Sequence, residues 1–537
     1  MPDGSNLFEI KSKKNIKHRL GIEFDNRRLK LALIFMFIIG AIIFYRLILI
    51  SIINGKEYKN IYANNHSKIE WILPKRGIIY DYQGKILAEN NIENKRYYPL
   101  KQAGSHIIGY ISKEDKIGIY GIEATYEDFL KGKPGFTIFN INNKGEIKGI
   151  KEVKEPESGN NLYLHIDYDA QERLYNELLK QIIYKNSPGG AAILMNPKNG
   201  AVKALVSIPS FDNNFQSKDE LIKTLQSEQA PFFNRAISGE YSSGSTIKPF
   251  IAAAALSENI INPDFKMETH GSITVDSIYN KNIKWTFKDW KNHGFVNMID
   301  ALAYSSNVYF YTIGGGYKDI TGLGINKIDK YLQKFGMGSK TKIDIIGESK
   351  GLIPSPKWKS ININEDWYIG DTYNTSIGQG FLRITPIQLA SATSVIANSG
   401  TLYQPQIANS VVSDTGDIIW KNEPKILEDN VIKKEYLDII KNGMRKAVTM
   451  GTNWRLNELP EQVAAKTGSA EAGNNREAHS WVTVLNYNND SLKNEQGKPF
   501  VLSILVENGG NGETSAVPIA KNFLSWYLDD KNESQEH

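Results

Sequence analysis

A serine and a lysine stand three residues apart in one short segment of this chain, an arrangement that can support nucleophilic catalysis. The segment is SSGSTIKPF, with Ser245 and Lys248, and an alanine-rich run that predicts a helix follows it. Residues three apart on a helix share a face, so the two side chains would meet. A serine hydroxyl needs a base to attack an acyl group, and a lysine in a dry site beside other cations can be that base. Taken alone, the pair is better explained as a helix cap followed by a surface lysine.

A second segment, AYSSNVYFY, adds groups that can move a proton and bind an amide. Ser305 can pass a proton to a leaving amine, and Asn307 can hold both Lys248 and a substrate amide. The same residue types are also common in ordinary turns. This segment therefore indicates catalysis only in combination with the others.

The third segment is the apolar stretch VAAKTGSAE, which predicts a strand. Gly468 would leave room for a peptide to lie along that strand as an added strand. Lys466 and the hydroxyls of Thr467 and Ser469 would hold a carboxylate. The Ser469 N–H could pair with the Ser245 N–H as an oxyanion hole. The alternative interpretation is a lysine at a strand end near a turn.

The elements around these segments predict an α+β domain. Pro249 fits the first turn of the helix after Ser245, and helical stretches fill the chain from there to about Lys446. Before them, GGAAILMNP and GAVKALVSIPS predict an apolar hairpin; after them, VAAKTGSAE, SWVTVLNY and FVLSILVENG predict strands. Strands at both ends and helices between them predict one antiparallel sheet with helices packed on it.

An apolar run near the N-terminus predicts a membrane anchor. Residues 31–53 contain a single charge, Arg46, whose long stem could reach the headgroups. Eight basic residues precede the run: Lys11, Lys13, Lys14, Lys17, Arg19, Arg27, Arg28 and Lys30. By the positive-inside rule we expect a single-pass protein of the bacterial cytoplasmic (inner) membrane, with its N-terminus in the cytoplasm and the rest outside or in the periplasm. The alternative is a buried core helix.

The chain divides into five predicted parts. We expect a cytoplasmic tail at 1–30, a transmembrane helix at 31–53, a small α+β pedestal at 54–159, the catalytic domain at 160–530 and a polar tail at 531–537.

Within the pedestal, residues 75–91 predict two short strands around a turn at Gln83 and Gly84. Residues 118–135 predict one helix, ended by Gly and Pro, and polar strands follow to about Gly159.

The composition excludes other kinds of function. Cysteine is absent, which rules out thiol catalysis, disulfides and cysteine-based zinc sites. The net charge of +5 is too small over this length to indicate nucleic acid binding, and no basic stripe is interleaved with aromatic residues. We expect no cofactor.

From about Tyr45 to Leu528 the chain resembles the class B penicillin-binding proteins, and within them the elongation-type transpeptidases. The resemblance is carried by NRAISGEYSSGSTIKPF, ALVSIPSFDNN, PKRGIIYDYQGKILAEN and WYIGDTYNTSIGQGFLRITPIQLA (367–390). It implies a penicillin-recognising serine acyltransferase fold, in which the three segments occur in this order. It also implies Ser245 as nucleophile, Lys248 as base, Ser305 and Asn307 as the second motif and Lys466 to Gly468 as the third.

Two features depart from that family. Only residues 92–95 stand where the family usually has a head subdomain of several dozen residues. Some elongation enzymes also bind zinc beside the second motif. Asp289 and His293 echo that site, but Ser306 stands where the family has a cysteine ligand. Because an incomplete ligand set holds zinc poorly, we expect Asp289 and His293 to be loop hydrogen-bonding residues and not metal ligands.

The resemblance implies a peptidoglycan D,D-transpeptidase that cross-links stem peptides ending in D-Ala-D-Ala, is blocked by β-lactams, and works in elongation with a membrane glycosyltransferase. Three alternatives stay open. They are a septal transpeptidase of the same class, a β-lactamase or D,D-carboxypeptidase that uses water as acceptor, and a non-catalytic scaffold of a membrane glycosyltransferase.

Overall fold

The structure is a computed structural model, and it describes residues 26–59, 67–142, 144–276, 282, 284–473, 475–487 and 498–529. Most of the predicted cytoplasmic tail and the predicted polar tail at 531–537 lie outside the described residues. The chain forms two compact units, Met1–Ile72 with Gly135–Glu155 and Leu73–Pro134 with Pro156–His537.

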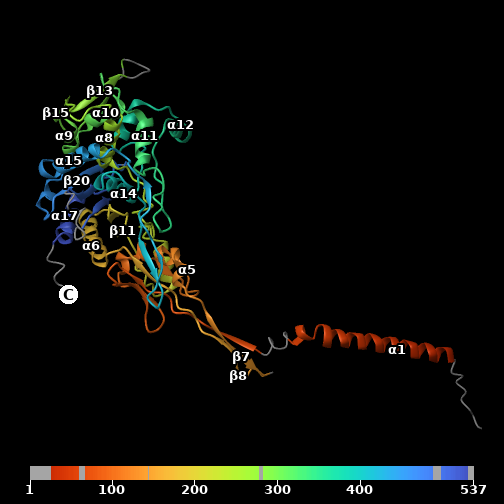
Figure 1. The fold of residues 1–537 in the computed structure, drawn as a ribbon. Coiled ribbons are helices and arrows are strands. Elements are labelled where there is room, and N and C mark those ends of the chain that lie inside the picture. The colour runs from red at the N-terminus through yellow and green to blue at the C-terminus, as the bar shows by residue number, and fades with distance from the viewer. Residues whose placement is uncertain are drawn as a thin grey trace, which may run out of the picture. The chain divides into compact units, whose positions relative to one another are not determined.

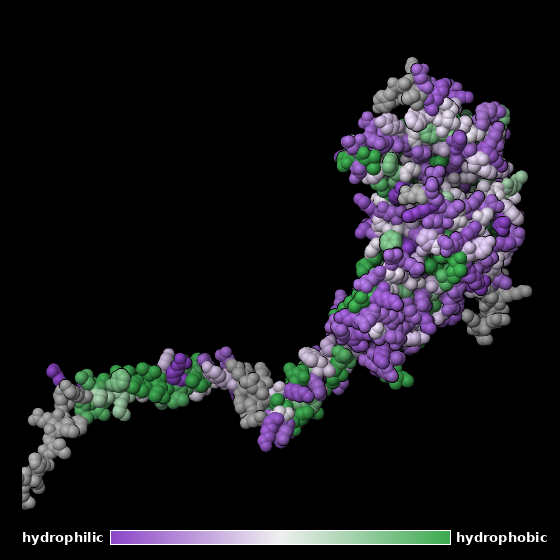
Figure 2. All heavy atoms as spheres, turned by 180° about the vertical axis from the view of Figure 1, so that it is seen from behind, coloured by the Kyte–Doolittle hydropathy of each residue, from purple (hydrophilic) through white to green (hydrophobic). Residues whose placement is uncertain are grey.

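The first unit contains the predicted membrane helix. Helix α1 spans Asn26–Ile48 and continues as a π-helical turn over Leu49–Ile53. Leu29–Ile53 is a segment of 25 residues that is long and apolar enough to cross a membrane. Its apolar stretch is not buried against the described part of the chain. Figure 2 shows apolar residues along this helix. About 20 residues suffice to span the hydrocarbon core, so the segment has the length of a single-pass anchor.

The first unit also contains a three-stranded antiparallel sheet. Its order is β1 (Ser67–Ile72), β7 (Gly135–Ile141) and β8 (Ile147–Lys154). Trp71 packs edge-to-face on Phe136 from the neighbouring strand, with ring centroids 5.8 Å apart. Strands β7 and β8 are the polar strands predicted after residue 135.

The second unit is built on a five-stranded antiparallel sheet (Figure 1). Its order is β11 (Val202–Ile208), β10 (Gly190–Met195), β22 (Val501–Val506), β21 (His479–Asn486) and β20 (Val463–Ala470). The hairpin and the three C-terminal strands predicted from the sequence thus form one sheet, as expected.

Helices cover both faces of this sheet. Alternate residues of a strand point to opposite faces. On β22, Val501 and Leu505 join the core around α14 (Pro386–Ala397). Leu502 and Ile504 join the core around α6 (Tyr168–Lys185) and α17 (Ala516–Tyr527).

The second unit contains further helices and four small strand pairs. The helices are α3 (Ser105–Ile108), α7 (Lys218–Leu225), α8 (Lys248–Ser257), α9 (Met298–Ala303), α10 (Asn307–Gly315), α11 (Gly324–Lys334), α12 (Pro356–Ile363), α13 (Ile369–Ser376) and α15 (Lys434–Met450). Small antiparallel pairs join β5 (Tyr110–Ile111) to β6 (Gly118–Tyr120), β12 (Met267–Thr269) to β15 (Gly294–Val296), β13 (Ser272–Asp276) to β14 (Lys284–Lys288), and β16 (Leu402–Tyr403) to β19 (Ile426–Glu428).

A second sheet, of six strands, was not predicted from the sequence. Its order is β18 (Ile418–Lys421), β17 (Ala408–Val412), β9 (Asn161–Leu164), β2 (Ile79–Tyr80), β3 (Ile86–Asn90) and β4 (Arg96–Tyr97). Strands β2 and β9 run parallel, and the other pairs are antiparallel. The sheet therefore joins pedestal strands to strands from the region predicted as helical.

The single helix predicted over 118–135 is wrong. The segment begins with β6 and continues as two short helices, α4 (Gly121–Thr125) and α5 (Glu127–Leu130). Gly121 has φ +63°, a left-handed conformation that interrupts a right-handed helix. The Gly118 N–H is bound at 2.9 Å by the Glu127 carboxylate, which fixes the extended start.

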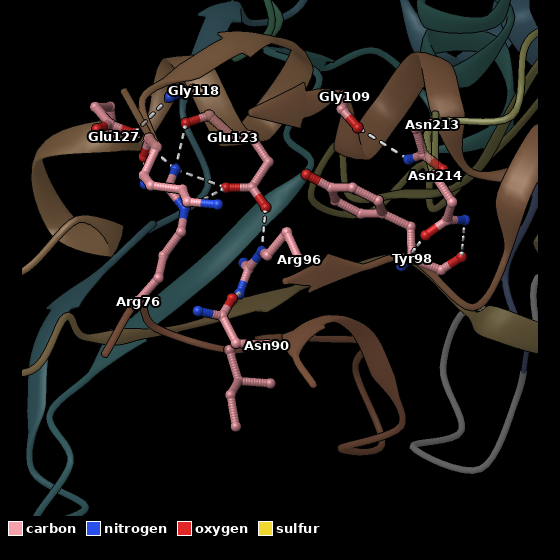
Figure 3. A network of polar contacts seen from close by, with 12 residues as sticks. Arg76, Asn90, Arg96, Tyr98, Gly109, Gly118, Glu123, Glu127, Asn213 and Asn214 are labelled. Carbon is pink, nitrogen blue, oxygen red and sulfur yellow. Dashed lines mark hydrogen bonds and ion pairs between the residues drawn. The ribbon is translucent and has the colours of Figure 1, made fainter. Parts of the chain in front are cut away.

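A buried ionic network holds these short elements together (Figure 3). The Glu123 side chain is fully buried and accepts from Arg76 Nε at 2.8 Å and from Arg96 Nε at 2.6 Å. Arg76 Nη2 also lies 2.6 Å from Glu127 Oε2, and Arg96 Nη1 donates to Asn90 Oδ1 at 3.2 Å. One carboxylate thus ties α4 to two segments distant in sequence.

Replacing this carboxylate should destabilise the protein. Removing one partner of a buried ion pair costs about 3–5 kcal/mol, because the other charge stays buried. We expect Glu123→Ala to lower the apparent Tm by at least about 5 °C, measured by tryptophan fluorescence on the detergent-solubilised full chain. Glu93→Ala is the matched control, since Glu93 pairs with Lys95 in an exposed turn. Equal Tm values for the two variants would show that the network contributes little.

Candidate active site

Ser245 lies in a tight turn that leads directly into a buried helix. The turn is a 3-10 helix over Gly244–Ile247, and α8 begins at Lys248 with Pro249 in its first turn. Ser245 is partly exposed, whereas Lys248 is fully buried. Gly244 has φ +53°, and a Cβ there would lie 2.7 Å from the Ser469 carbonyl oxygen. Only glycine fits the position that brings the turn against strand β20.

Lys248 is bound through its amine by the second segment. Its Nζ donates to the Ser305 carbonyl at 2.7 Å, to Asn307 Oδ1 at 2.7 Å and to Ser305 Oγ at 3.2 Å. Burial lowers the pKa of Lys248 to about 7. Near neutral pH a large fraction of this amine is therefore unprotonated and can accept a proton.

A second buried lysine meets the same serine from the opposite segment. Lys466 Nζ donates to Ser305 Oγ at 2.9 Å and to the Thr467 carbonyl at 2.9 Å. Burial and the neighbouring Lys248 lower the pKa of Lys466 well below its usual value. The Ser305 hydroxyl lies between two amines, so a proton can pass through it from one group to another.

Ser305 is held in an unusual backbone conformation. Its φ is +58°, in the left-handed region that is unfavourable for a residue with a Cβ. The next residue fixes the turn: the Ser306 N–H donates to the Ala301 carbonyl at 3.0 Å, and Ser306 Oγ accepts from the Tyr309 N–H at 3.4 Å as the cap of α10. Such strain persists only where the surroundings impose it, and it clusters at functional sites.

Asp289 and His293 lie beneath this turn. Asp289 Oδ2 accepts from Ser306 Oγ at 2.8 Å and from the Val308 N–H at 2.9 Å, at the N-terminus of α10. Burial opposes ionisation of Asp289, but the neighbouring His293 imidazole and the backbone N–H groups of Val308 and Asn307 lower its pKa to about 2. The carboxylate is therefore charged and anchors the second segment.

These side chains do not fit a zinc ion. His293 Nε2 lies 3.5 Å from Asp289 Oδ1, which gives two ligands of the usual four. The third neighbour, Ser306, offers a neutral hydroxyl where a thiolate would be needed. In the part of the chain that the structure describes, no group of three or more His, Cys, Asp or Glu side chains could hold a metal.

Strand β20 brings the third segment against the Ser245 turn. Thr467 is nearly buried and hydrogen-bonds through Oγ1 to Thr452 at 3.1 Å. Ser469 is exposed, and its Oγ accepts from the Gly512 N–H at 3.2 Å. A Cβ on Gly468 would lie 2.6 Å from the Ser243 carbonyl oxygen. The space at Gly468, expected for a peptide, is filled by the Ser245 turn.

Sequence reasoning missed the side chains that position this turn from behind. Trp481 Nε1 donates to the Ser242 carbonyl at 3.0 Å. Glu507 Oε1 accepts from Tyr241 OH at 2.7 Å and from Arg235 Nε at 3.1 Å. The sequence does show a glutamate at the end of an apolar strand, but its position there does not predict which residues it binds.

Comparisons with known proteins extend over most of the chain. The family model described as penicillin binding protein transpeptidase domain matches residues 190–525, and the penicillin-binding protein dimerisation domain matches 91–164. The chain is 27% identical to the peptidoglycan D,D-transpeptidase MrdA of Haemophilus influenzae, over 94% of this chain and 92% of that protein.

Two further relatives are similar to this chain over most of its length. The Escherichia coli protein of the same name is 30% identical over 78% of this chain and 69% of its own length. The crystal structure of Pseudomonas aeruginosa PBP2 in complex with WCK 5153 is 29% identical, with a TM-score of 0.70, over 87% of this chain and all of that chain. The α+β fold class predicted from the sequence is confirmed.

From the lowered pKa of Lys248 we expect the reaction with penicillin to depend on pH. A general base acts only when deprotonated, so the acylation rate constant for benzylpenicillin should rise as pH passes through about 7 and level off above about 8. Mass spectrometry of the full chain between pH 5.5 and 9 measures it. Lys248→Arg, which stays protonated, should be slower by about 10²–10⁴-fold. A rate that is flat or falls across pH 6–8 would contradict Lys248 as the base.

Proposed function

This chain belongs to the penicillin-binding protein transpeptidase family, and on that premise we propose that it cross-links peptidoglycan through an acyl-enzyme on Ser245. It is a serine D-Ala-D-Ala transpeptidase, like the relatives named peptidoglycan D,D-transpeptidase. The observation that carries the residue assignment is the Ser305 hydroxyl, 3.2 Å from the Lys248 amine and 2.9 Å from the Lys466 amine.

Acylation is the first step. Ser245 Oγ attacks the carbonyl carbon of the penultimate D-Ala, and its proton moves to the Lys248 amine. The new C–O bond forms as the C–N bond to the terminal D-Ala breaks. Ser305 gives its hydroxyl proton to the leaving nitrogen and recovers a proton from Lys248. The net transfer is one proton from Ser245 to the released amine, by way of Lys248 and Ser305, whose Nζ and Oγ atoms lie 3.2 Å apart.

Strand β20 binds the substrate in this proposal. Lys466 and the hydroxyls of Thr467 and Ser469 hold the terminal carboxylate. The N–H groups of Ser245 and Ser469 bind the oxyanion that forms during attack. Because Lys466 is buried with a lowered pKa, an incoming carboxylate would favour its protonated form.

Transfer to an amine completes the reaction. The amine of a second stem peptide attacks the ester carbonyl, a new C–N bond forms as the C–O bond to Ser245 breaks, and the amine's proton returns to Ser245 Oγ along the reverse path. Hydrolysis would instead need a base placed for water. Asp289, the carboxylate of this network, is engaged by Ser306 and Val308 under α10, which favours a transpeptidase over a β-lactamase or carboxypeptidase.

The cellular role is assigned by resemblance, and the topology is assigned from the charges that precede α1. Residues 367–390 resemble the elongation-type enzymes, so we assign the chain to cell elongation, with a membrane glycosyltransferase as partner. The basic residues before α1 favour an N-terminus in the cytoplasm and catalysis on the outer side of the membrane.

Intact-mass spectrometry with benzylpenicillin tests the assignment of Ser245. We expect a single adduct that persists for hours and is absent from Ser245→Ala, because an acyl-enzyme without a placed water base is released slowly. An adduct that disappears while the drug is consumed would point to a hydrolase. No adduct on the wild-type chain would favour the scaffold alternative.

A further inference from the structure

The substrate-facing edge of β20 carries backbone groups that pair with no other strand among the described residues. Strand β20 is the last strand of the five-stranded sheet and pairs with β21 on one side only, with Ser469 opposite Ser480. In an antiparallel strand, alternate residues direct their N–H and C=O groups to the same edge. Thr467, Ser469 and Glu471 therefore share one edge.

The Gln379 carboxamide occupies part of this edge. Its Nε2 donates to the Ser469 carbonyl at 3.4 Å, and its Oε1 accepts from the Glu471 N–H at 3.3 Å. A carboxamide presents an N–H donor and a carbonyl acceptor side by side, as the N–H and C=O of one residue in an extended strand do. Gln379 thus makes the pair of hydrogen bonds that the next strand would make. Both bonds are long, so they are weak and easily exchanged.

The loop that carries Gln379 is fixed to the Ser245 turn. The Gly244 N–H donates to the Gly378 carbonyl at 2.9 Å, and a Cβ on Gly378 would lie 2.1 Å from the Gly244 carbonyl oxygen. Gly378 and Gly380 have φ of +75° and +69°, so two left-handed glycines flank Gln379. One side chain therefore connects the nucleophile turn to the strand that the proposed substrate joins.

We propose that Gln379 is a specificity-determining residue that stands in for the donor peptide on β20 and gives up the Ser469 carbonyl when substrate binds. This inference rests on the proposed function. A ligand with an amide N–H can replace the Gln379 hydrogen bond with one of its own. A ligand without such a group gains nothing by displacing it. A ligand with an amide N–H therefore gains only the difference in free energy between its own hydrogen bond to the Ser469 carbonyl and the similar hydrogen bond that Gln379 gives up.

Two β-lactams separate these cases. Benzylpenicillin has a 6-acylamino N–H, and penicillanic acid has the same bicyclic ring without that group. In Gln379→Ala the Ser469 carbonyl is open to the ligand. We expect the ratio of acylation rate constants, benzylpenicillin over penicillanic acid, to rise roughly 2- to 10-fold, the scale of one hydrogen bond. Gln379→Asn, whose side chain is one methylene shorter, should behave like Gln379→Ala.

The control is Gln404→Ala, which removes another glutamine that binds a backbone carbonyl, that of Lys342 at 2.7 Å. It should leave the ratio unchanged. If the acylation rate constants of both ligands fall equally in Gln379→Ala, Gln379 only stabilises the structure of the site. If the acylation rate constant falls for benzylpenicillin alone, Gln379 contacts the bound ligand and is not displaced by it. Either result overturns the inference while the proposed function stands. A wild-type chain that neither compound acylates would overturn both.

Discussion

Two lysine amines buried around one serine hydroxyl are the constraint on which the site depends. An isolated ammonium is expensive to bury, and a protein relieves that cost by lowering the pKa or by providing acceptors. Both occur here: burial lowers the pKa of Lys248 and Lys466, and carbonyl and amide oxygens surround the two amines. Because Lys248 binds Ser305 and Asn307 while Lys466 binds the Ser305 hydroxyl, satisfying the amines fixes how the three segments meet.

The fold supplies that meeting point from distant parts of the chain. Helix α8 carries Lys248, the turn before α10 carries Ser305, and β20 carries Lys466. Close approach of these backbones needs small residues. Gly244 and Gly468 each lack space for a Cβ because the Ser245 turn and β20 touch there. A methyl group at either position would separate the serine from the strand.

Local patterns predicted the elements with strong hydrophobic periodicity. The hairpin of β10 and β11, the three C-terminal strands and the apolar α1 follow directly from the sequence, as does helix α6. The six-stranded sheet could not be foreseen, because its members are two to five residues long and one of its pairings, β17 with β9, joins residues more than 200 positions apart, as Val411 and Leu162 are. Gly468 and the serines proposed to be catalytic were singled out by motif. Trp481, Glu507 and Gln379 are defined only by tertiary contacts, which no spacing along the chain encodes.

An enzyme that binds peptide by strand addition must keep one sheet edge open, and an open edge exposes unpaired backbone groups. In β20 side chains take the place of a strand: the Lys466 amine binds the Thr467 carbonyl, and Gln379 binds Ser469 and Glu471. Hydrogen bonds from side chains can be exchanged one at a time, whereas a paired strand would have to be displaced along its whole length. The edge is thereby satisfied without substrate and remains accessible to it. The Lys466 amine binds both the Ser305 hydroxyl and the Thr467 carbonyl, so a ligand that took over the Thr467 carbonyl would also change the hydrogen bonds of Ser305.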